Sequence, residues 1–249
     1  MKNHSAYILS TAVGALVVLC GMSSMAEQGR RARVENVFKA LDVCERDNES
    51  QKELIASSFN LDDSDVSTLM LKAINRFANK RGEATAKTAI ACIVSADPVK
   101  GLEWLMDNYT NFTAIGRANM LQGLRHQNQA ETYEIVFSCL DDRSMVADMR
   151  AFRLCPGPYR HLRVCDYACN TLRYMLLSSR SQTKGEVPHR IHSSTKIVDR
   201  NKIVDAWRKW WKTKGPAVLK RKEALSEKAP GLKDKITILR QKIKASAKQ

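Results

Sequence analysis

Four residues whose side chains could bind a metal or act as nucleophiles lie close together in the chain: Cys155, His161, Cys165 and Cys169. Thiolates at positions i and i+4 of a helix share one face and can hold a Zn²⁺ ion together with an imidazole. A cysteine could also attack a substrate if a histidine were positioned as its base. The spacing matches none of the common zinc modules, however, and the histidines occur in polar or loop settings without a motif.

The wider sequence contains no serine nucleophile elbow, no phosphate-binding glycine loop and no His-Glu-x-x-His pattern. We therefore predict no enzyme activity, no bound metal and no cofactor. A small metal- or thiol-dependent enzyme that uses Cys155, His161, Cys165 and Cys169 remains the alternative.

The cysteines also allow a structural interpretation. If residues 1–26 are removed, six of the seven cysteines remain, and an even number in an oxidising compartment is compatible with disulfides. Most of them lie on apolar helix stripes, where a free cysteine behaves as a small buried hydrophobe. We expect core positions for these, and Cys155 with Cys165 or Cys169 is the pair that could form a disulfide.

Three further residues indicate structural roles. Asp166 lies within an apolar helix stripe, where a buried carboxylate needs a partner, and we expect a backbone amide, Arg163 or Arg208 to supply it. Trp207 and Trp211 are spaced i, i+4 and are expected to pack into the core. A platform on which a ligand stacks is the alternative for the two tryptophans.

The net charge of +15 is unevenly distributed. Residues 27–142 contain 14 Lys/Arg and 18 Asp/Glu, whereas residues 201–249 contain 15 and 4. A basic C-terminal half attracts an anionic partner. The predicted binding residues are the following: Lys202, Arg208, Lys209, Lys212, Lys220, Arg221 and Lys222.

Apolar residues recur with a period near 3.6 along the chain, so the expected fold class is all-α. Pro98 and Thr113 are expected at helix starts, and Gly215-Pro216 at a helix end. The predicted helices cover residues 34–44, 66–81, 85–96, 98–109, 114–124, 131–140, 162–177, 199–215, 217–228 and 232–244. Two polar or irregular connections, 143–160 and 178–196, interrupt this series.

The last predicted helix carries Leu232, Ile236, Leu239 and Ile243 on one face and lysines on the other. Such a basic amphipathic helix could bind an anionic membrane surface, pair with another helix or rest on the end of the domain. Non-specific contact with nucleic acid is also compatible with it, but nothing in the tail points to sequence-specific reading of bases.

The residues from Leu140 to Leu172 resemble a HEAT repeat. Leu140-Asp141-Asp142 is similar to its acidic inter-helix turn, and Val164, Asp166, Ala168 and Leu172 fit the second helix. The segment Ala206-Trp207-Arg208-Lys209-Trp210-Trp211 also looks like the closing helix of exported bacterial HEAT-like proteins. The resemblance implies an α-solenoid of stacked antiparallel helix pairs with a protein-binding role. The insertion at 143–160 departs from the pattern.

The N-terminus has a short polar start, an apolar run from Ala6 and the small-residue triplet Ser24-Met25-Ala26, the pattern of a secretory signal peptide. Arg30, Arg31 and Arg33 follow, and positive charge there also fits an inner-membrane anchor through residues 6–25. We expect a signal peptide or anchor (1–26), a helical-repeat domain (27–215) and a basic helical tail (216–249). The expected function is an exported, periplasmic or secreted scaffold that binds a protein or another anionic macromolecule.

Overall fold

The structure is a computed structural model, and it describes residues 83–146, 162–178 and 186–246. The predicted signal segment, the helices expected at 34–44 and 66–81, Cys155 and His161 lie outside these residues. Within them the chain is all-helical, with seven α-helices and no strand. The helices are α4 (Glu83–Ala96), α5 (Pro98–Asn108), α6 (Ala114–Leu124), α7 (Ala130–Ser138), α9 (Val164–Ser178), α10 (Ile197–Leu219) and α11 (Gly231–Ser246).

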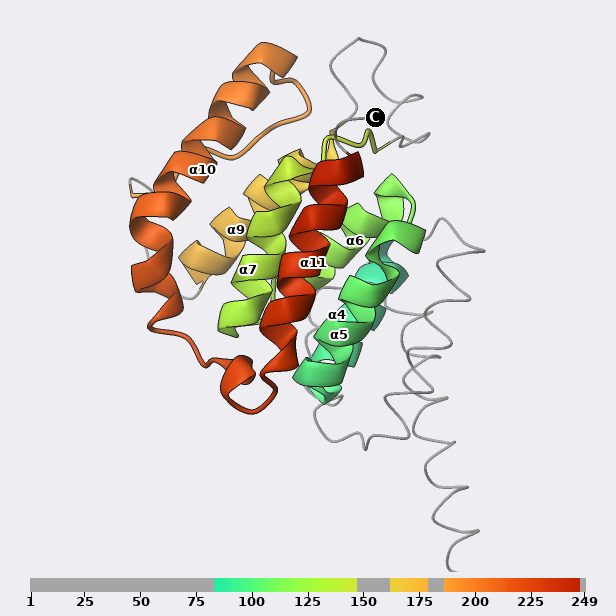
Figure 1. The fold of residues 1–249 in the computed structure, drawn as a ribbon. Helices are drawn as coiled ribbons and strands as arrows, with labels where there is room; N and C mark the ends of the chain where they lie inside the picture. Colours follow the sequence, from blue (N-terminus) through green and yellow to red (C-terminus); the bar gives the residue numbers. More distant parts are fainter. Residues whose placement is uncertain (1–82, 147–161, 179–185, 247–249) are drawn as a thin grey trace, which may run out of the picture.

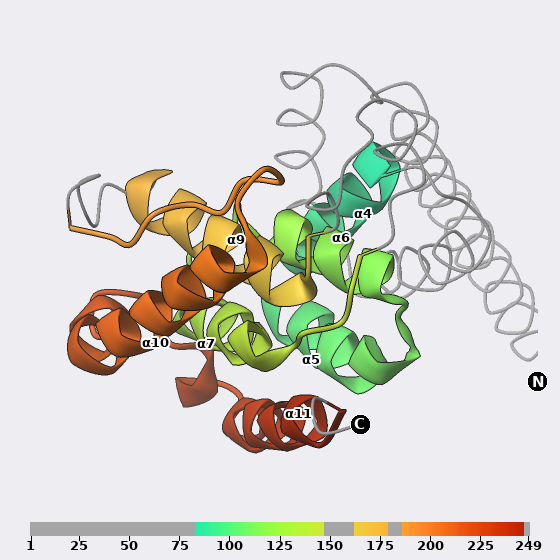
Figure 2. The same ribbon diagram turned by 90° about the horizontal axis from the view of Figure 1, so that it is seen from above.

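The helices form two rows with one further helix outside them. Seen from above, α4, α6 and α9 lie in one row and α5, α7 and α10 in a second (Figure 2). Along the first row α4 packs on α6 and α6 on α9, while α5 packs on α4 and α10 on α9. The C-terminal α11 returns to the second row and covers α5 and α7 (Figure 1).

The expected helix starts at Pro98 and Thr113 are confirmed. The side chain of Asp97 accepts a hydrogen bond from the amide of Lys100 at 3.0 Å, and Pro98 occupies the first turn of α5. Thr113 caps α6 by accepting from the amide of Gly116 at 3.2 Å. In each case a side-chain oxygen satisfies an amide that has no partner within the helix.

The first row is held by a close contact between α4 and α6. A Cβ atom built on Gly123 would lie 2.7 Å from Cγ2 of Ile90 and 2.8 Å from the carbonyl oxygen of Lys87. Only glycine lets the two backbones approach this closely. Ile90 is fully buried in that contact, as expected for a helix that is apolar on most sides.

The described residues at the two ends of the 143–160 insertion lie side by side. Met145 and Arg163 form an isolated antiparallel bridge, and the amide of Val164 donates to the carbonyl of Ser144 at 3.0 Å. The amide of Cys165 also donates to the carbonyl of Asp142 at 2.8 Å. The acidic turn therefore lies directly beside the start of α9, although the sequence separates the two.

The predicted helix end at Gly215-Pro216 is wrong, because α10 continues to Leu219. A Cβ on Gly215 would lie 2.8 Å from the ring of Trp211, so this glycine makes room for the indole instead of ending the helix. Pro216 lacks an amide hydrogen, but it lies in the last turn, where its carbonyl still accepts from the amide of Lys220 at 3.1 Å. The helix expected at 217–228 is correspondingly wrong, since this stretch contains only the end of α10, a turn and a short 3₁₀ helix, η3 (Leu225–Glu227).

The helix expected at 232–244 is confirmed as α11, and its apolar stripe belongs to the core. Leu232, Ile236, Leu239 and Ile243 are each at most 2% exposed. Lys235 adds an ion pair to Asp107 of α5 at 2.7 Å. None of the helices in the described part of the chain combines the length and apolar character that crossing a bilayer requires.

Candidate functional site

A groove of about 570 Å³ lies where α7, α10 and α11 meet. Its apolar surface comes from α7, from the short 3₁₀ helix η2 (Cys139–Asp141) and from α10: Phe137, Leu140, Trp211, Pro216 and Leu219. Its charged surface comes from two acids, Glu134 and Asp141, and four cations, Arg208, Lys212, Arg240 and Lys244. This is a mixed surface with an excess of positive charge.

The floor of the groove is an ordered aromatic stack. The ring of Trp211 lies 5.0 Å from that of Phe137 at an interplanar angle of 16°, and 6.4 Å from that of Tyr133 at 15°. Trp211 is 6% exposed and Trp207 is fully buried one turn earlier. The two indoles thus occupy the core face of α10, and one edge of Trp211 reaches the groove.

The cations of the groove are spaced i, i+4 on two facing helices. Arg208 and Lys212 lie on α10, and Arg240 and Lys244 lie on α11. Residues with this spacing share a helix face, so each helix presents a pair toward the groove.

The two arginines of the groove contact other groups of the protein, Arg208 more completely than Arg240. The guanidinium of Arg208 contacts Asp141 at 2.7 Å and Asp205 at 2.6 Å, and it donates to the carbonyl of Leu140 at 2.9 Å. Arg240 donates to the hydroxyl of Ser138 at 2.9 Å. Arg208 thus uses most of its donors within the folded protein, whereas Arg240, among the described residues, donates through Nε alone and otherwise only approaches Glu134 at 4.0 Å.

The two lysines of the groove, unlike the arginines, are not bonded to acids in the described part of the protein. Lys212 and Lys244 are exposed, and neither makes an ion pair with any residue that the structure describes. Since a lysine ammonium has three donors on a flexible stem, these are the charges available to a ligand.

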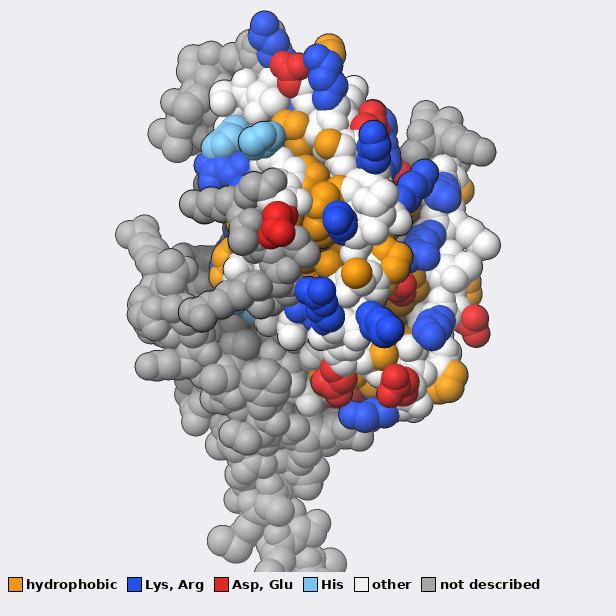
Figure 3. Space-filling view, turned by 90° about the vertical axis from the view of Figure 1, so that its left-hand side faces the viewer, with side chains coloured by type: hydrophobic (Ala, Val, Ile, Leu, Met, Phe, Trp, Pro, Cys, Tyr) orange, Lys and Arg blue, Asp and Glu red, His pale blue; other side chains and the backbone are white. Residues whose placement is uncertain are grey.

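Of the basic residues predicted from the sequence, Arg208 and Lys212 line the groove. Lys209, Lys220 and Arg221 are exposed on α10 and the turn after it, and Lys202 pairs with Asp199 at 3.2 Å. Figure 3, which looks onto α10, shows basic side chains around patches of apolar ones on this face.

Lys222 is turned inward. Its ammonium lies 5.1 Å from the centre of the Tyr133 ring and donates to Asn128 at 2.6 Å. Burial lowers the pKa of this lysine. It therefore contributes to packing between α7 and the turn after α10, away from the groove.

Arg240 and Lys244 were missed by sequence reasoning. Both belong to the basic side of α11, and only the docking of α11 against α7 brings them to the groove. Their i, i+4 spacing on a basic amphipathic helix was a signal, but the sequence does not say which helix they face.

Asp166 is fully buried at the start of α9. It accepts from the backbone amide of Arg163 at 2.9 Å, the return bond of a capping box, and from the guanidinium of Arg163 at 2.9 Å. Arg200 of α10 approaches it at 3.4 Å. Arg163 is thus a partner as expected, whereas the other candidate, Arg208, is wrong because Asp141 and Asp205 hold it elsewhere.

The segment before α10 is tied to α9 and α10 by side chains that bond its backbone. Asn170 donates to the carbonyl of Ile191 at 2.9 Å and accepts from its amide at 2.8 Å. The indole N–H groups of Trp207 and Trp210 donate to the carbonyls of His189 and Glu186 at 3.3 and 2.6 Å. The tryptophan cluster therefore also positions the chain that enters α10.

The described cysteines are free thiols in the core. Burial raises the pKa of Cys139 to about 12 and that of Cys165 to about 12, and it raises the pKa of Cys169 well above its ordinary value. Such thiols are protonated near neutral pH and are poor nucleophiles. Cys155 and His161 lie outside the described residues, and within those residues no three His, Cys, Asp or Glu side chains gather as a metal site.

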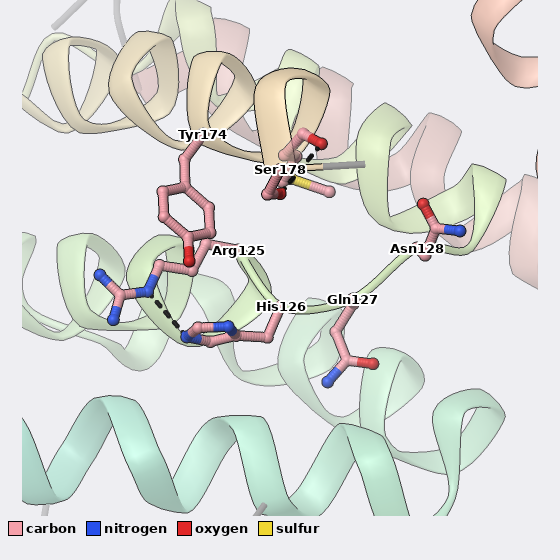
Figure 4. Close-up of a pocket in the computed structure, with 7 residues that line it drawn as sticks. Arg125, His126, Gln127, Asn128, Tyr174 and Ser178 are labelled. Carbon is pink, nitrogen blue, oxygen red and sulfur yellow. Dashed lines mark hydrogen bonds between the residues drawn. The ribbon is translucent and has the colours of Figure 1, made fainter. Parts of the chain in front are cut away.

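A second hollow of about 370 Å³ lies between the end of α6 and the end of α9 (Figure 4). The guanidinium of Arg125 lies 5.2 Å from the centre of the Tyr174 ring and its Nε donates to His126 at 2.8 Å. The hydroxyl of Ser178 donates to the carbonyl of Met175 in its own helix. This arrangement is a stacked cation beside a polar loop and does not activate the serine.

No protein-family model matches the chain, and no match was found among curated proteins or solved structures. The groove and the basic face around it therefore provide the basis for a functional assignment.

Proposed function

We propose that this protein is an exported helical-repeat scaffold that binds an anionic macromolecule through the face formed by α10 and α11. The observation that carries the proposal is the concentration of unpaired positive charge there. Residues 197–246 contain 15 Lys/Arg and only 5 Asp/Glu. Lys209, Lys212, Lys220, Arg221 and Lys244 on this face are exposed and make no ion pair within the described residues.

Two features support a repeat architecture of the HEAT-like kind. The pairs α4–α5, α6–α7 and α9–α10 each place one helix in either row of Figure 2. The acidic turn at Asp141-Asp142 also lies beside α9, as a repeat turn would, because the amide of Cys165 donates to the carbonyl of Asp142. Stacked pairs of this kind offer extended surfaces for binding other macromolecules.

A binding role fits the chemistry better than the enzyme alternative. The described thiols of the Cys165–Cys169 cluster are buried and have raised pKa values, whereas the exposed basic residues are accessible. Surface charge of one sign speeds association with an oppositely charged partner and makes binding sensitive to salt.

Charge reversal tests the proposal. Because α11 supplies core residues, truncating the chain after Gly215 would unfold the site, so we suggest Lys209, Lys212 and Lys220 changed together to glutamate. An exposed-site control places glutamates at Thr110 and Asn111, outside α10 and α11. Binding to a dye-labelled polyglutamate peptide, measured by fluorescence anisotropy, should be lost in the triple variant and kept in the control. Equal binding by wild type and triple variant would overturn the proposal.

The export part needs its own measurement. Intact mass of the mature protein, before and after reduction and alkylation, reports whether cleavage follows Ala26 and whether any cysteine is oxidised. A mature protein that retains residues 1–26 would contradict cleavage and favour the anchor.

A further inference from the structure

We propose that the groove between α7, α10 and α11 determines which partner is bound, and that it takes an acidic segment of a partner protein that presents one bulky apolar side chain. The apolar side chain would lie on the floor formed by Trp211, Phe137 and Leu219. Carboxylates on either side of it would pair with Lys212 and Lys244. This inference rests on the proposed function and specifies its partner.

The size and shape of the groove favour a side chain as the occupant. A volume of about 570 Å³ is in the range of small-ligand pockets and holds one or two side chains. The floor is pre-formed, because Trp211 is stacked on Phe137 and its ring occupies the space that Gly215, which has no Cβ, leaves open. Pre-formed apolar floors favour binding because little ordering is needed when the ligand arrives.

The charge pattern favours carboxylates in small number. Arg208 is paired with Asp141 and Asp205, and Arg240 donates to Ser138 through Nε, so part of the charge that borders the groove is already used. Lys212 on α10 and Lys244 on α11 remain, exposed and without an ion pair to any described residue. Two lysines without an ion pair to a described residue, placed on two helices beside an apolar floor, are complementary to an apolar residue flanked by acids.

Other anionic partners fit the groove less well. Single-stranded nucleic acid is held by stacking of bases on exposed aromatic faces, and Trp211 is only 6% exposed. An amphipathic helix binds a membrane through an accessible apolar stripe, and the stripe of α11 is packed against α5 and α7. An acidic peptide requires neither feature.

Two peptides and two pairs of variants test the inference. The probes are a dye-labelled glutamate-rich peptide with one central leucine and the same peptide with serine in that place. Pro216→Glu puts a carboxylate into the groove at an exposed position, and Ala217→Glu makes the same charge change at the next, exposed residue, which does not line the groove. Lys244→Glu and Lys242→Glu form the second pair, since only Lys244 lines the groove.

We expect the wild type to bind the leucine peptide about tenfold more tightly than the serine peptide. Pro216→Glu should abolish this preference, and Ala217→Glu should keep it. Lys244→Glu should weaken binding of the leucine peptide more than Lys242→Glu does. Circular dichroism of each variant checks that the helices remain folded.

The outcomes separate this inference from the function on which it rests. If neither peptide binds, the proposed function itself fails. If both peptides bind equally, or if Pro216→Glu and Ala217→Glu behave alike, the basic face binds acids but the groove does not select them. If a single-stranded oligonucleotide or anionic vesicles displace the leucine peptide from the groove at lower concentrations than the unlabelled peptide does, the protein partner is the wrong occupant.

Discussion

The carboxylate of Glu131 joins the connection between α10 and α11 to the first turn of α7, and its removal should loosen α11. Glu131 is 2% exposed. Its two oxygens accept from the backbone amides of Leu225 at 3.0 Å and Ser226 at 2.8 Å. The amide of Ala130 donates to the carbonyl of Glu223 at 2.9 Å beside them. The sequence separation of these partners is more than ninety residues.

The expected loss in the free energy of unfolding follows from the two hydrogen bonds that Glu131 accepts. Each bond to a charged group contributes about 1.5–3 kcal/mol, and its loss leaves a buried amide without an acceptor. Glu131→Ala removes both and should lower the free energy of unfolding by about 3–5 kcal/mol. Glu131→Gln keeps one acceptor oxygen and should cost about 1.5–2.5 kcal/mol.

The pH dependence of the folding stability gives a second, independent test of the role of Glu131. Burial alone would raise the pKa of Glu131, but the hydrogen bonds from Ser226 and Leu225 outweigh it, so its pKa in the folded protein is lowered. A lowered folded-state pKa gives stability that is complete above the unfolded value, about 4.3, and is lost as the pH falls through the folded value. The difference between wild type and Glu131→Gln should therefore be constant near neutral pH and shrink below about pH 4.

Urea unfolding followed by circular dichroism measures these differences, and limited proteolysis between α10 and α11 reports local release. Glu134→Gln is a matched control, because Glu134 lies on the same helix and only approaches Arg240 at 4.0 Å. That contact is partly exposed and should contribute less than about 1 kcal/mol. If Glu131→Gln were no less stable than Glu134→Gln, or if its effect did not change with acid, the carboxylate would not be the tether described above.

Three further predictions concern the core. Gly215→Ala forces a Cβ against the Trp211 ring and should destabilise the fold by about 1–3 kcal/mol in thermal unfolding, although alanine is the better helix former. Arg200→Met leaves Asp166 with Arg163 but breaks the bonds of Arg200 to Thr195 and Ser193, and urea unfolding should show a loss of about 2–4 kcal/mol. Cys139, with its pKa near 12, should resist a thiol reagent in the native protein and react after denaturation, and fast native labelling by mass spectrometry would contradict its burial.

Local features of this protein follow directly from its sequence. The cap at Thr113, the helix start at Pro98 and the stripe of α11 depend on residues within one or two turns of each other, and all three are confirmed. The need of Asp166 for a partner was also predictable, because an apolar stripe predicts burial and a buried carboxylate must be bonded.

The wrong predictions concern positions where a contact distant in the sequence outweighs the local sequence pattern. Gly215-Pro216 is a common helix end, but the ring of Trp211 needs the space that Gly215 leaves. The partner of Asp166 from α10 is Arg200 instead of Arg208, because the phase of α10 relative to α9 decides which arginine faces it. Neither the fit of the Trp211 ring against Gly215 nor the phase of α10 relative to α9 can be deduced from a local sequence pattern.

The groove depends even more on contacts between residues that are far apart in the sequence. Its walls come from α7, α10 and α11, and the sequence identifies the basic sides of α10 and α11 without identifying which helix faces meet. Arg240 reaches Ser138 across more than a hundred residues, so Lys244 enters the site only through the docking of α11. The candidate charges on α10 were predictable, and their counterparts on α11 were not.

The roles of Glu131 and Pro216 can therefore be separated experimentally. When only a small fraction of molecules has α11 released, the apparent dissociation constant changes only by the inverse of the competent fraction, so Glu131→Gln should lower stability and leave peptide affinity nearly unchanged near neutral pH. Pro216→Glu should weaken binding of the leucine peptide and leave stability nearly unchanged, since residue 216 is exposed and its replacement removes no core contact. A partner that bridges α10 and α11 should in turn protect the connection between them from protease, because it binds only the docked state. If the leucine peptide gave no such protection at saturating concentration, it would be bound to one helix alone and not in the groove.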